Sequence, residues 1–191
     1  MFVSGRGSNL KSILDYFKLN NKVEIKLIVT DNLLCKALDI AGQNKIPFYC
    51  IDKKKSEHGF DNLSELLKKE KVELIVLAGY LKLLPSSFVS NYSQRIINIH
   101  PGLLPAYGGK GMYGINVHNA VLVSGDKESG ATVHFVDENY DTGNIISQKK
   151  VDISDCKTPE DIAARVLNIE HQLLPNVIND IVDGKIIIGV N

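Results

Sequence analysis

The chain opens with MFVSGRGSNL, residues 1–10, in which a short apolar run leads into two glycines and a helix start. This order of strand, glycine loop and helix is typical of a parallel α/β sheet. Free backbone N–H groups and the helix dipole at such a loop attract an anion, for example a phosphate. Leu10 replaces the third glycine of a dinucleotide-binding fingerprint, and no Gly-Lys-Ser/Thr follows. The loop therefore predicts a binding site for a single phosphate. A tight turn with a Ser helix cap would explain the same residues.

The rest of the chain continues the alternation of short β-branched runs with segments of helical period. Strands are predicted at residues 1–3, 24–30, 48–50, 74–77 and 95–99, and helices at 9–19, 34–43, 59–69 and 85–92. After a helix that ends at Ser124, residues 129–136 and 144–150 are predicted as an antiparallel pair. A long helix begins behind a Thr158 cap, with a bend or break at Pro175, and residues 185–190 are predicted as a last strand. We therefore predict a single-domain, doubly wound α/β fold, with a mostly parallel sheet, helices on both faces and an antiparallel C-terminal addition.

The composition argues against nucleic-acid and membrane partners. Lys plus Arg and Asp plus Glu each number 22, so no broad basic field exists to bind nucleic acid. No apolar run reaches the roughly 18 to 20 residues of a membrane span, and no signal peptide is evident, which predicts a cytoplasmic protein without a membrane partner. The three cysteines, Cys35, Cys50 and Cys156, are an odd number at wide, irregular spacing, which fits neither a disulfide framework nor a zinc ribbon and predicts reduced structural thiols.

The segment from Ile96 to Pro105 carries the strongest chemical signal. Asn98 and His100 stand two residues apart in an apolar strand, so their side chains share one face of the sheet. They lie at the carboxyl end of that strand, where open α/β sheets bind their ligands. An amide and an imidazole at this place form a credible pair for acyl transfer, although a hydrogen-bonded core histidine is the structural alternative.

Several segments in a fixed order carry a resemblance to a known family. They are residues 4–10, 77–80, 98–105, 132–136, 141–143 and 165–171. On these segments the chain resembles the folate-dependent glycinamide ribonucleotide formyltransferases over nearly its whole length. The resemblance implies one formyltransferase domain over residues 1–191, with a phosphate-binding, Rossmann-like half at 1–100 and a half at 101–191 that completes the folate and substrate sites. It also implies small-molecule partners and a monomer or homodimer.

The resemblance implies transfer of a formyl group from 10-formyltetrahydrofolate, the co-substrate, to the amine of glycinamide ribonucleotide. Asn98 would stabilise the oxyanion, His100 would donate the proton, and Asp141 would pair with His100 and raise its pKa. The substrate-binding residues carried over are Gly7, Ser8 and Asn9 for the phosphate, Glu170 for the amine, and His134. The folate-binding residues carried over are Leu81, Lys82, Leu83, Leu84, Asn98, Asp137, Glu138, Asn139, Tyr140 and Asp141. We expect no metal, because the histidines lack a tight ligand spacing.

Two other functions remain open from the sequence. Another folate-dependent formyltransferase, such as the enzyme that formylates methionyl-tRNA, or a formyltetrahydrofolate hydrolase shares the Asn-x-His-Pro chemistry, although the chain shows no second domain and no basic patch for tRNA. A non-catalytic phosphate-binding module would need only the glycine loop. Single residues also have structural explanations, since Asp141 lies in a turn-rich segment and Glu170 on a helix.

Overall fold

The computed structural model describes residues 1–51 and 56–189, with side chains throughout except at residues 56–58. Its contacts group the described residues into two compact units, residues 1–97 with residues 188 and 189, and residues 98–187. The fold is α/β with an open, mostly parallel sheet, which confirms the predicted fold class. That the whole chain forms one domain, with halves at 1–100 and 101–191, stays a prediction.

In the first unit, the first residues of the chain lie between two parallel strands. Phe2 bridges Val29 of β1 (Ile28–Thr30) on one side and Leu77 of β3 (Ile75–Leu77) on the other. β1 also pairs in parallel with β2 (Phe48–Cys50), in the register Ile28 to Phe48. The predicted strand at 24–30 is therefore shorter than expected, whereas the predicted strand at 48–50 is confirmed.

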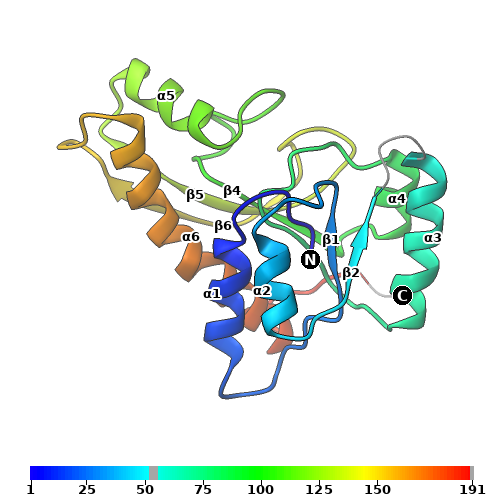
Figure 1. The fold of residues 1–191 in the computed structure, drawn as a ribbon. Helices are drawn as coiled ribbons and strands as arrows, with labels where there is room; N and C mark the ends of the chain where they lie inside the picture. The colour runs from blue at the N-terminus through cyan, green and yellow to red at the C-terminus, as the bar shows by residue number, and fades with distance from the viewer. Residues whose placement is uncertain (52–55, 190–191) are drawn as a thin grey trace. The chain divides into compact units, whose positions relative to one another are not determined.

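The helices of the first unit follow the strands as the alternation predicts. They are α1 (Ser8–Phe17), α2 (Ala37–Gln43), α3 (Ser56–Lys69) and α4 (Ser86–Asn91). α1 and α2 lie side by side (Figure 1) and close over a buried cluster of Val3, Leu10, Ile28, Cys35, Ala37 and Ala41. Burial of each of the larger aliphatic side chains, Val3, Leu10 and Ile28, contributes about 1.5–3 kcal/mol. This cluster fixes the glycine loop, because Val3 and Leu10 lie on either side of it in the sequence.

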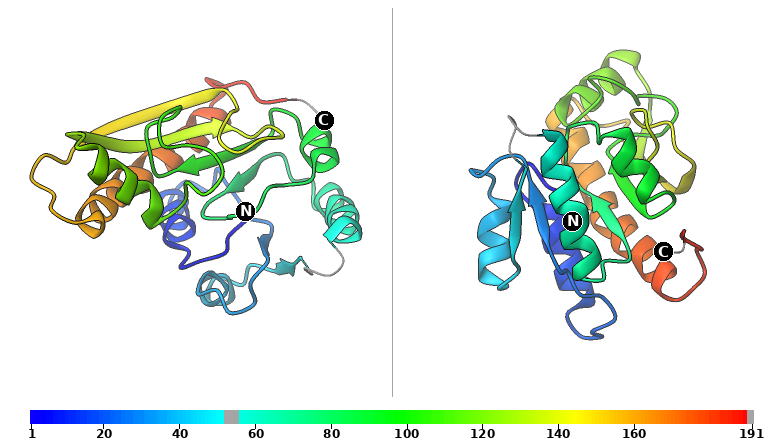
Figure 2. Two further views of the ribbon diagram at one scale, coloured as in Figure 1. Left: turned by 90° about the horizontal axis from the view of Figure 1, so that it is seen from above. Right: turned by 90° about the vertical axis from the view of Figure 1, so that its right-hand side faces the viewer.

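The second unit holds the carboxyl half of β4 (Ile96–His100), followed by α5 (Ile115–Ser124), β5 (Glu128–Phe135), β6 (Ile145–Asp152) and α6 (Pro159–Val182). Its strand order is β4-β5-β6, and β5 and β6 are antiparallel, as predicted. α6 runs along the long β5–β6 pair (Figure 2) and also packs against α5. The connection between β5 and β6 therefore projects from one end of this pair.

α6 begins as predicted but does not break at Pro175. Thr158 and Asp161 exchange side-chain to backbone hydrogen bonds in a capping box, with Pro159 in the first turn. The helix continues through Pro175, which is buried together with Leu173, Leu174, Val177 and Ile178. A proline inside a helix costs about 3 kcal/mol, and burial of this apolar face offsets that cost.

The strand predicted at residues 185–190 is wrong for the residues that the structure describes, and Val190 lies outside them. The backbone N–H groups of Lys185 and Ile186 donate to the Asp180 carbonyl oxygen at 2.9 and 3.2 Å. They therefore finish the C-terminal turn of α6 instead of entering a sheet ladder.

We predict that Gly7→Ala destabilises the first unit and Gly5→Ala does not. Gly7 has a φ of 77°, and an added Cβ would lie 2.8 Å from the Ala37 Cβ, whereas a Cβ on Gly5 would meet nothing within 4 Å. We expect Gly7→Ala to lower the free energy of unfolding by about 1–3 kcal/mol and Gly5→Ala to change it by less than about 0.5 kcal/mol. Urea unfolding of both variants measures the difference, and equal stabilities would contradict the predicted strain.

Candidate active site

Two polar side chains project from the same face of β4. Asn98 and His100 are separated by Ile99, which faces the other way and is buried. His100 is only 3% exposed, whereas Asn98 is half-buried. The structure thus confirms the strand and the shared face on which the predicted pair depends.

Asp141 reaches these side chains from the loop between β5 and β6. Its Oδ2 accepts a hydrogen bond from the Gly109 N–H at 2.9 Å and lies 3.6 Å from His100 Nδ1, and its Oδ1 lies 3.6 Å from His134 Nε2. Asp141 has a φ of 58°, a left-handed conformation that aspartate tolerates better than most residues. The three predicted catalytic residues and His134 therefore come together.

The predicted rise in the pKa of His100 is wrong. Burial lowers the pKa of His100 below its ordinary value of 6.5, and the nearby His134 imidazole adds to this. The negative charge of Asp141 and the hydrogen bond to the Tyr107 carbonyl act in the opposite direction but do not outweigh burial. The sequence showed the carboxylate but could not show how completely the imidazole is removed from water.

The same surroundings keep Asp141 ionised. Burial would raise the pKa of this carboxyl, but the interactions with His134, His100 and the Gly109 N–H outweigh it. The pKa of Asp141 therefore lies below its ordinary value of 3.8. The site holds a carboxylate at neutral pH.

The hydrogen bond to Tyr107 fixes the tautomer of His100. His100 Nε2 lies 2.8 Å from the Tyr107 carbonyl oxygen, which can only accept, so Nε2 carries a hydrogen. Nδ1, which faces Asp141, is then the nitrogen that gains or loses a proton. Tyr107 has a φ of 57°, and its hydroxyl lies within hydrogen-bond distance of Ser124 and Asp126. Sequence reasoning missed this residue, because its contribution to the site is a backbone carbonyl.

A buried hydroxyl secures the loop that follows His100. Thr132 Oγ1, on β5, donates to the Gly102 carbonyl oxygen at 2.6 Å and accepts from the Leu104 N–H at 3.2 Å. Gln148 Nε2, on β6, donates to both Thr132 Oγ1 and the Leu104 carbonyl oxygen, at 2.9 and 3.0 Å. The antiparallel pair thereby sets the path of the loop that carries Tyr107 and Gly109.

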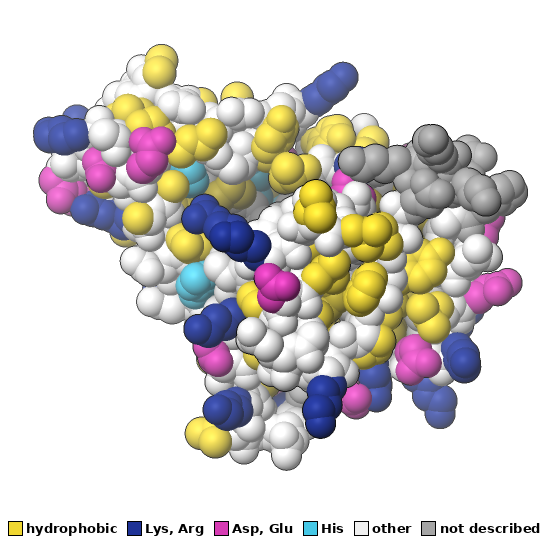
Figure 3. Space-filling model, viewed as in Figure 1, with side chains coloured by type: hydrophobic (Ala, Val, Ile, Leu, Met, Phe, Trp, Pro, Cys, Tyr) yellow, Lys and Arg dark blue, Asp and Glu magenta, His cyan; other side chains and the backbone are white. Residues whose placement is uncertain are grey.

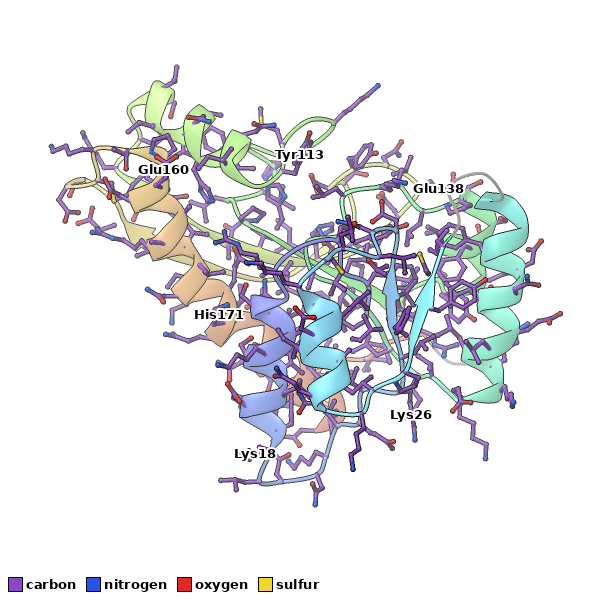
Figure 4. All side chains as sticks on the ribbon, in the orientation of Figure 1. Lys18, Lys26, Tyr113, Glu138, Glu160 and His171 are labelled. Atoms are coloured by element: carbon purple, nitrogen blue, oxygen red, sulfur yellow. The ribbon has the colours of Figure 1, made fainter. Side chains whose placement is uncertain are left out.

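The candidate residues on the connection between β5 and β6 differ in their contacts. Asp137 organises its own turn, because its carboxylate accepts from the Asn139 N–H and the Thr142 hydroxyl. Glu138, labelled in Figure 4, and Tyr140 are exposed on the same connection. Glu170, on α6, is only 9% exposed, so it does not lie on the solvated helix face that was its structural alternative.

The candidate residues of the first unit form a separate group. Gly7 is the N-cap of α1 and makes no side-chain cap, so Ser8 and Asn9 open the helix behind it. Ser4, in the same loop, donates to Asp31 at 2.7 Å, and Lys82 pairs with the other oxygen of that carboxylate at 3.1 Å. Asp31 was assigned no role from the sequence, yet it ties the glycine loop to the segment that follows β3.

The leucines of that segment divide into two kinds. Leu81 and Leu83 are 48% and 45% exposed, whereas Leu84 is buried in the core. The two exposed side chains offer an apolar surface next to backbone groups, and Leu84 anchors the segment.

A third buried histidine accompanies the site. His118, on α5, is 4% exposed, and its Nδ1 has no hydrogen-bond partner. Burial and the neighbouring His100 lower the pKa of His118 to about 4. Within residues 1–51 and 56–189, no group of three or more His, Cys, Asp or Glu side chains has the arrangement of a metal site.

Comparison with known proteins points to one class of enzyme. The sequence profile of the formyl transferase family matches residues 1–178. A Vigna unguiculata protein named phosphoribosylglycinamide formyltransferase, chloroplastic, is 44% identical, and the match covers 98% of this chain and 61% of that protein. A Bacillus subtilis phosphoribosylglycinamide formyltransferase is 37% identical, with 95% and 92% covered. The solved structure of the phosphoribosylglycinamide formyltransferase of Coxiella burnetii is 33% identical, with a TM-score of 0.89 over 100% of this chain and 88% of that one.

The chain therefore spans about three fifths of the length of the plant relative, 61%, and most of the length of the bacterial one, 92%.

We predict that Thr132→Val destabilises the protein although it barely changes the side-chain volume. The change leaves the Gly102 carbonyl and the Leu104 N–H without their buried partner, which costs about 1–3 kcal/mol. Thr142→Val removes an exposed hydroxyl from Asp137 and should cost less than about 1 kcal/mol. Urea unfolding of the two variants provides the measurement, and a fully stable Thr132→Val protein would show that the hydroxyl does not secure the loop.

Proposed function

Because this chain belongs to the formyl transferase family, we propose that it transfers the formyl group of 10-formyltetrahydrofolate to the amine of glycinamide ribonucleotide, a step of purine biosynthesis. The products are formylglycinamide ribonucleotide and tetrahydrofolate. We infer the substrates from the names of its relatives and from the motifs at residues 4–10 and 98–105. The groups suited to the chemical step lie in the second unit.

One observation carries the proposal. Within the second unit a carboxamide, two imidazoles and a carboxylate converge, with Asn98 Nδ2 3.0 Å from His134 Nε2 and His100 Nδ1 3.6 Å from Asp141. Burying such polar groups costs free energy unless they pair with one another, and clusters of groups with shifted pKa values occur preferentially at functional sites. Core packing alone gives no reason to place an ionised carboxylate beside two buried histidines.

These groups meet the needs of formyl transfer. Attack of the amine on the formyl carbon develops negative charge on the formyl oxygen, and a carboxamide N–H of Asn98 is suited to stabilise it. The attacking nitrogen must lose a proton, and the leaving folate nitrogen must gain one. His100 exchanges a proton at Nδ1, and Asp141 favours its charged form, so this pair is suited to move that proton.

The binding residues follow from the resemblance and fit their local chemistry. Gly7, Ser8 and Asn9 would hold the phosphate, because they open α1 where backbone N–H groups are directed outward. Glu170 would hold the amine as a carboxylate partner. The segment from Leu81 to Leu84 and the connection from Asp137 to Asp141 would hold the folate.

The distribution of charge on the surface also favours small-molecule substrates. On the face drawn in Figure 3, Lys and Arg side chains are interspersed with Asp and Glu. Among the described helices, none combines the length and hydrophobicity of a bilayer span. We propose a cytoplasmic location and a monomer or homodimer, although the plant relative is named chloroplastic.

An absorbance assay tests the proposed function. The protein is mixed with 10-formyltetrahydrofolate, with and without glycinamide ribonucleotide, and the appearance of tetrahydrofolate is followed. We expect turnover that requires the amine and is lost in His100→Ala, while circular dichroism shows the variant folded. Turnover without the amine would indicate a hydrolase, and no turnover in either mixture would favour a binding module.

We predict that Asp141→Asn moves the pH profile of kcat/KM. The charge of Asp141 raises the pKa of His100, so its removal lowers that pKa further, and the limb that reports His100 should move to lower pH. Turnover should fall by about 100-fold, the lower end of what an acid–base group contributes. Asp137→Asn, in the same connection, should leave the position of the limb unchanged. A limb that stays in place in Asp141→Asn would separate Asp141 from the ionisation of His100.

A further inference from the structure

His134 contacts the carboxamide that the proposed function assigns to the oxyanion. It is 2% exposed on β5, and its Nε2 lies 3.0 Å from Asn98 Nδ2. Its other nitrogen, Nδ1, lies 2.8 Å from the carbonyl oxygen of Phe135. The family resemblance suggests substrate contact for His134, but these two distances point to a different role.

The backbone decides which nitrogen of His134 carries the hydrogen. A carbonyl oxygen only accepts, so Nδ1 donates to Phe135, and in the neutral ring Nε2 keeps its lone pair. That lone pair needs a donor. Asp141 Oδ1, at 3.6 Å, is ionised and has no hydrogen to offer, whereas the amide nitrogen of Asn98 has two.

The contact selects one of two orientations of Asn98. The last torsion of an asparagine side chain is broad and roughly two-fold, so an isolated carboxamide presents its oxygen or its nitrogen with similar ease. If it turned over, the Asn98 oxygen would face the lone pair of His134 Nε2, and this contact would be repulsive.

We propose that His134 is a positioning residue that holds the Asn98 carboxamide with its nitrogen toward the reacting centre. One N–H of Asn98 Nδ2 donates to His134 Nε2, and the second remains for the oxygen of the migrating formyl group. The inference rests on the proposed function for the identity of that oxygen. The orientation of Asn98 itself does not depend on any substrate.

Two substitutions separate the two nitrogens of His134. His134→Asn can place an amide N–H near the position of Nδ1 and keep the bond to Phe135, but it has no atom at the position of Nε2. His134→Gln reaches the position of Nε2 with an oxygen that accepts from Asn98, and it gives up the bond to Phe135. The pair therefore tests the acceptor separately from the backbone contact.

We expect His134→Asn to lower kcat by at least about tenfold, bounded by the roughly 100- to 1,000-fold that loss of an oxyanion donor costs. KM for both substrates should change little, and His134→Gln should recover most of kcat. In an Asn98→Ala background, His134→Asn should have no further effect. Equal losses in the Asn and Gln variants, an undiminished effect without Asn98, or a change confined to KM would each overturn the proposal.

A measurement without substrate keeps this test apart from the proposed function. In 15N-labelled protein, an N–H···N hydrogen bond gives a scalar coupling between Asn98 Nδ2 and His134 Nε2, and the Asn98 signal is assigned by its loss in Asn98→Ala. We expect the coupling in the parent protein. Its absence would overturn the proposal even in an active enzyme, while its presence in a protein without formyl transfer would retain the Asn98 orientation and reject the proposed function. If His134→Asn does not fold, kcat of His134→Gln and this coupling still test the proposed role of His134.

Discussion

The second unit is arranged around one buried negative charge. An isolated carboxylate in a low-dielectric interior is strongly unfavourable, and it persists only with charged or hydrogen-bonding partners. Asp141 accepts a hydrogen bond from the Gly109 N–H, on the loop after β4, and lies 3.6 Å from His100 at the end of β4 and 3.6 Å from His134 on β5. The loops after β4 and β5 must therefore converge on this carboxylate. The antiparallel β5–β6 pair makes this possible, because it places His134 and Asp141 on either side of one turn.

The two histidines beside Asp141 are anchored through opposite nitrogens. Tyr107 accepts from His100 Nε2, which leaves Nδ1 facing the carboxylate, whereas Phe135 accepts from His134 Nδ1, which leaves Nε2 facing Asn98. Each ring is thus turned by a backbone carbonyl rather than by another side chain. In the proposed mechanism, His100 would therefore exchange a proton, whereas His134 would accept a hydrogen bond from Asn98.

The sequence predicted those parts of the molecule that depend on local pattern. The alternation of strands and helices, the antiparallel addition, the Thr158 helix cap and the shared face of Asn98 and His100 all follow from periodicity or from residues close in sequence. The continuous helix through Pro175 and the absence of a strand in the described residues after α6 did not follow, because burial and the Asp180 carbonyl decide them. Tyr107, Gly109 and Thr132 act through backbone groups or across strands, so no pattern in the sequence distinguishes them.

The pKa of His100 shows how burial changes the chemistry that the residue types alone suggest. A histidine beside a carboxylate is expected to be charged, yet the desolvation of a ring with 3% exposure outweighs that attraction. Neutral His100 directs the lone pair of Nδ1 toward Asp141, and their separation of 3.6 Å exceeds an ordinary hydrogen bond. Uptake of a proton from an attacking amine would turn this contact into an ion pair and draw the two groups together. In the proposed mechanism, the hydrogen bond between His100 and Asp141 would therefore form only when His100 takes up this proton.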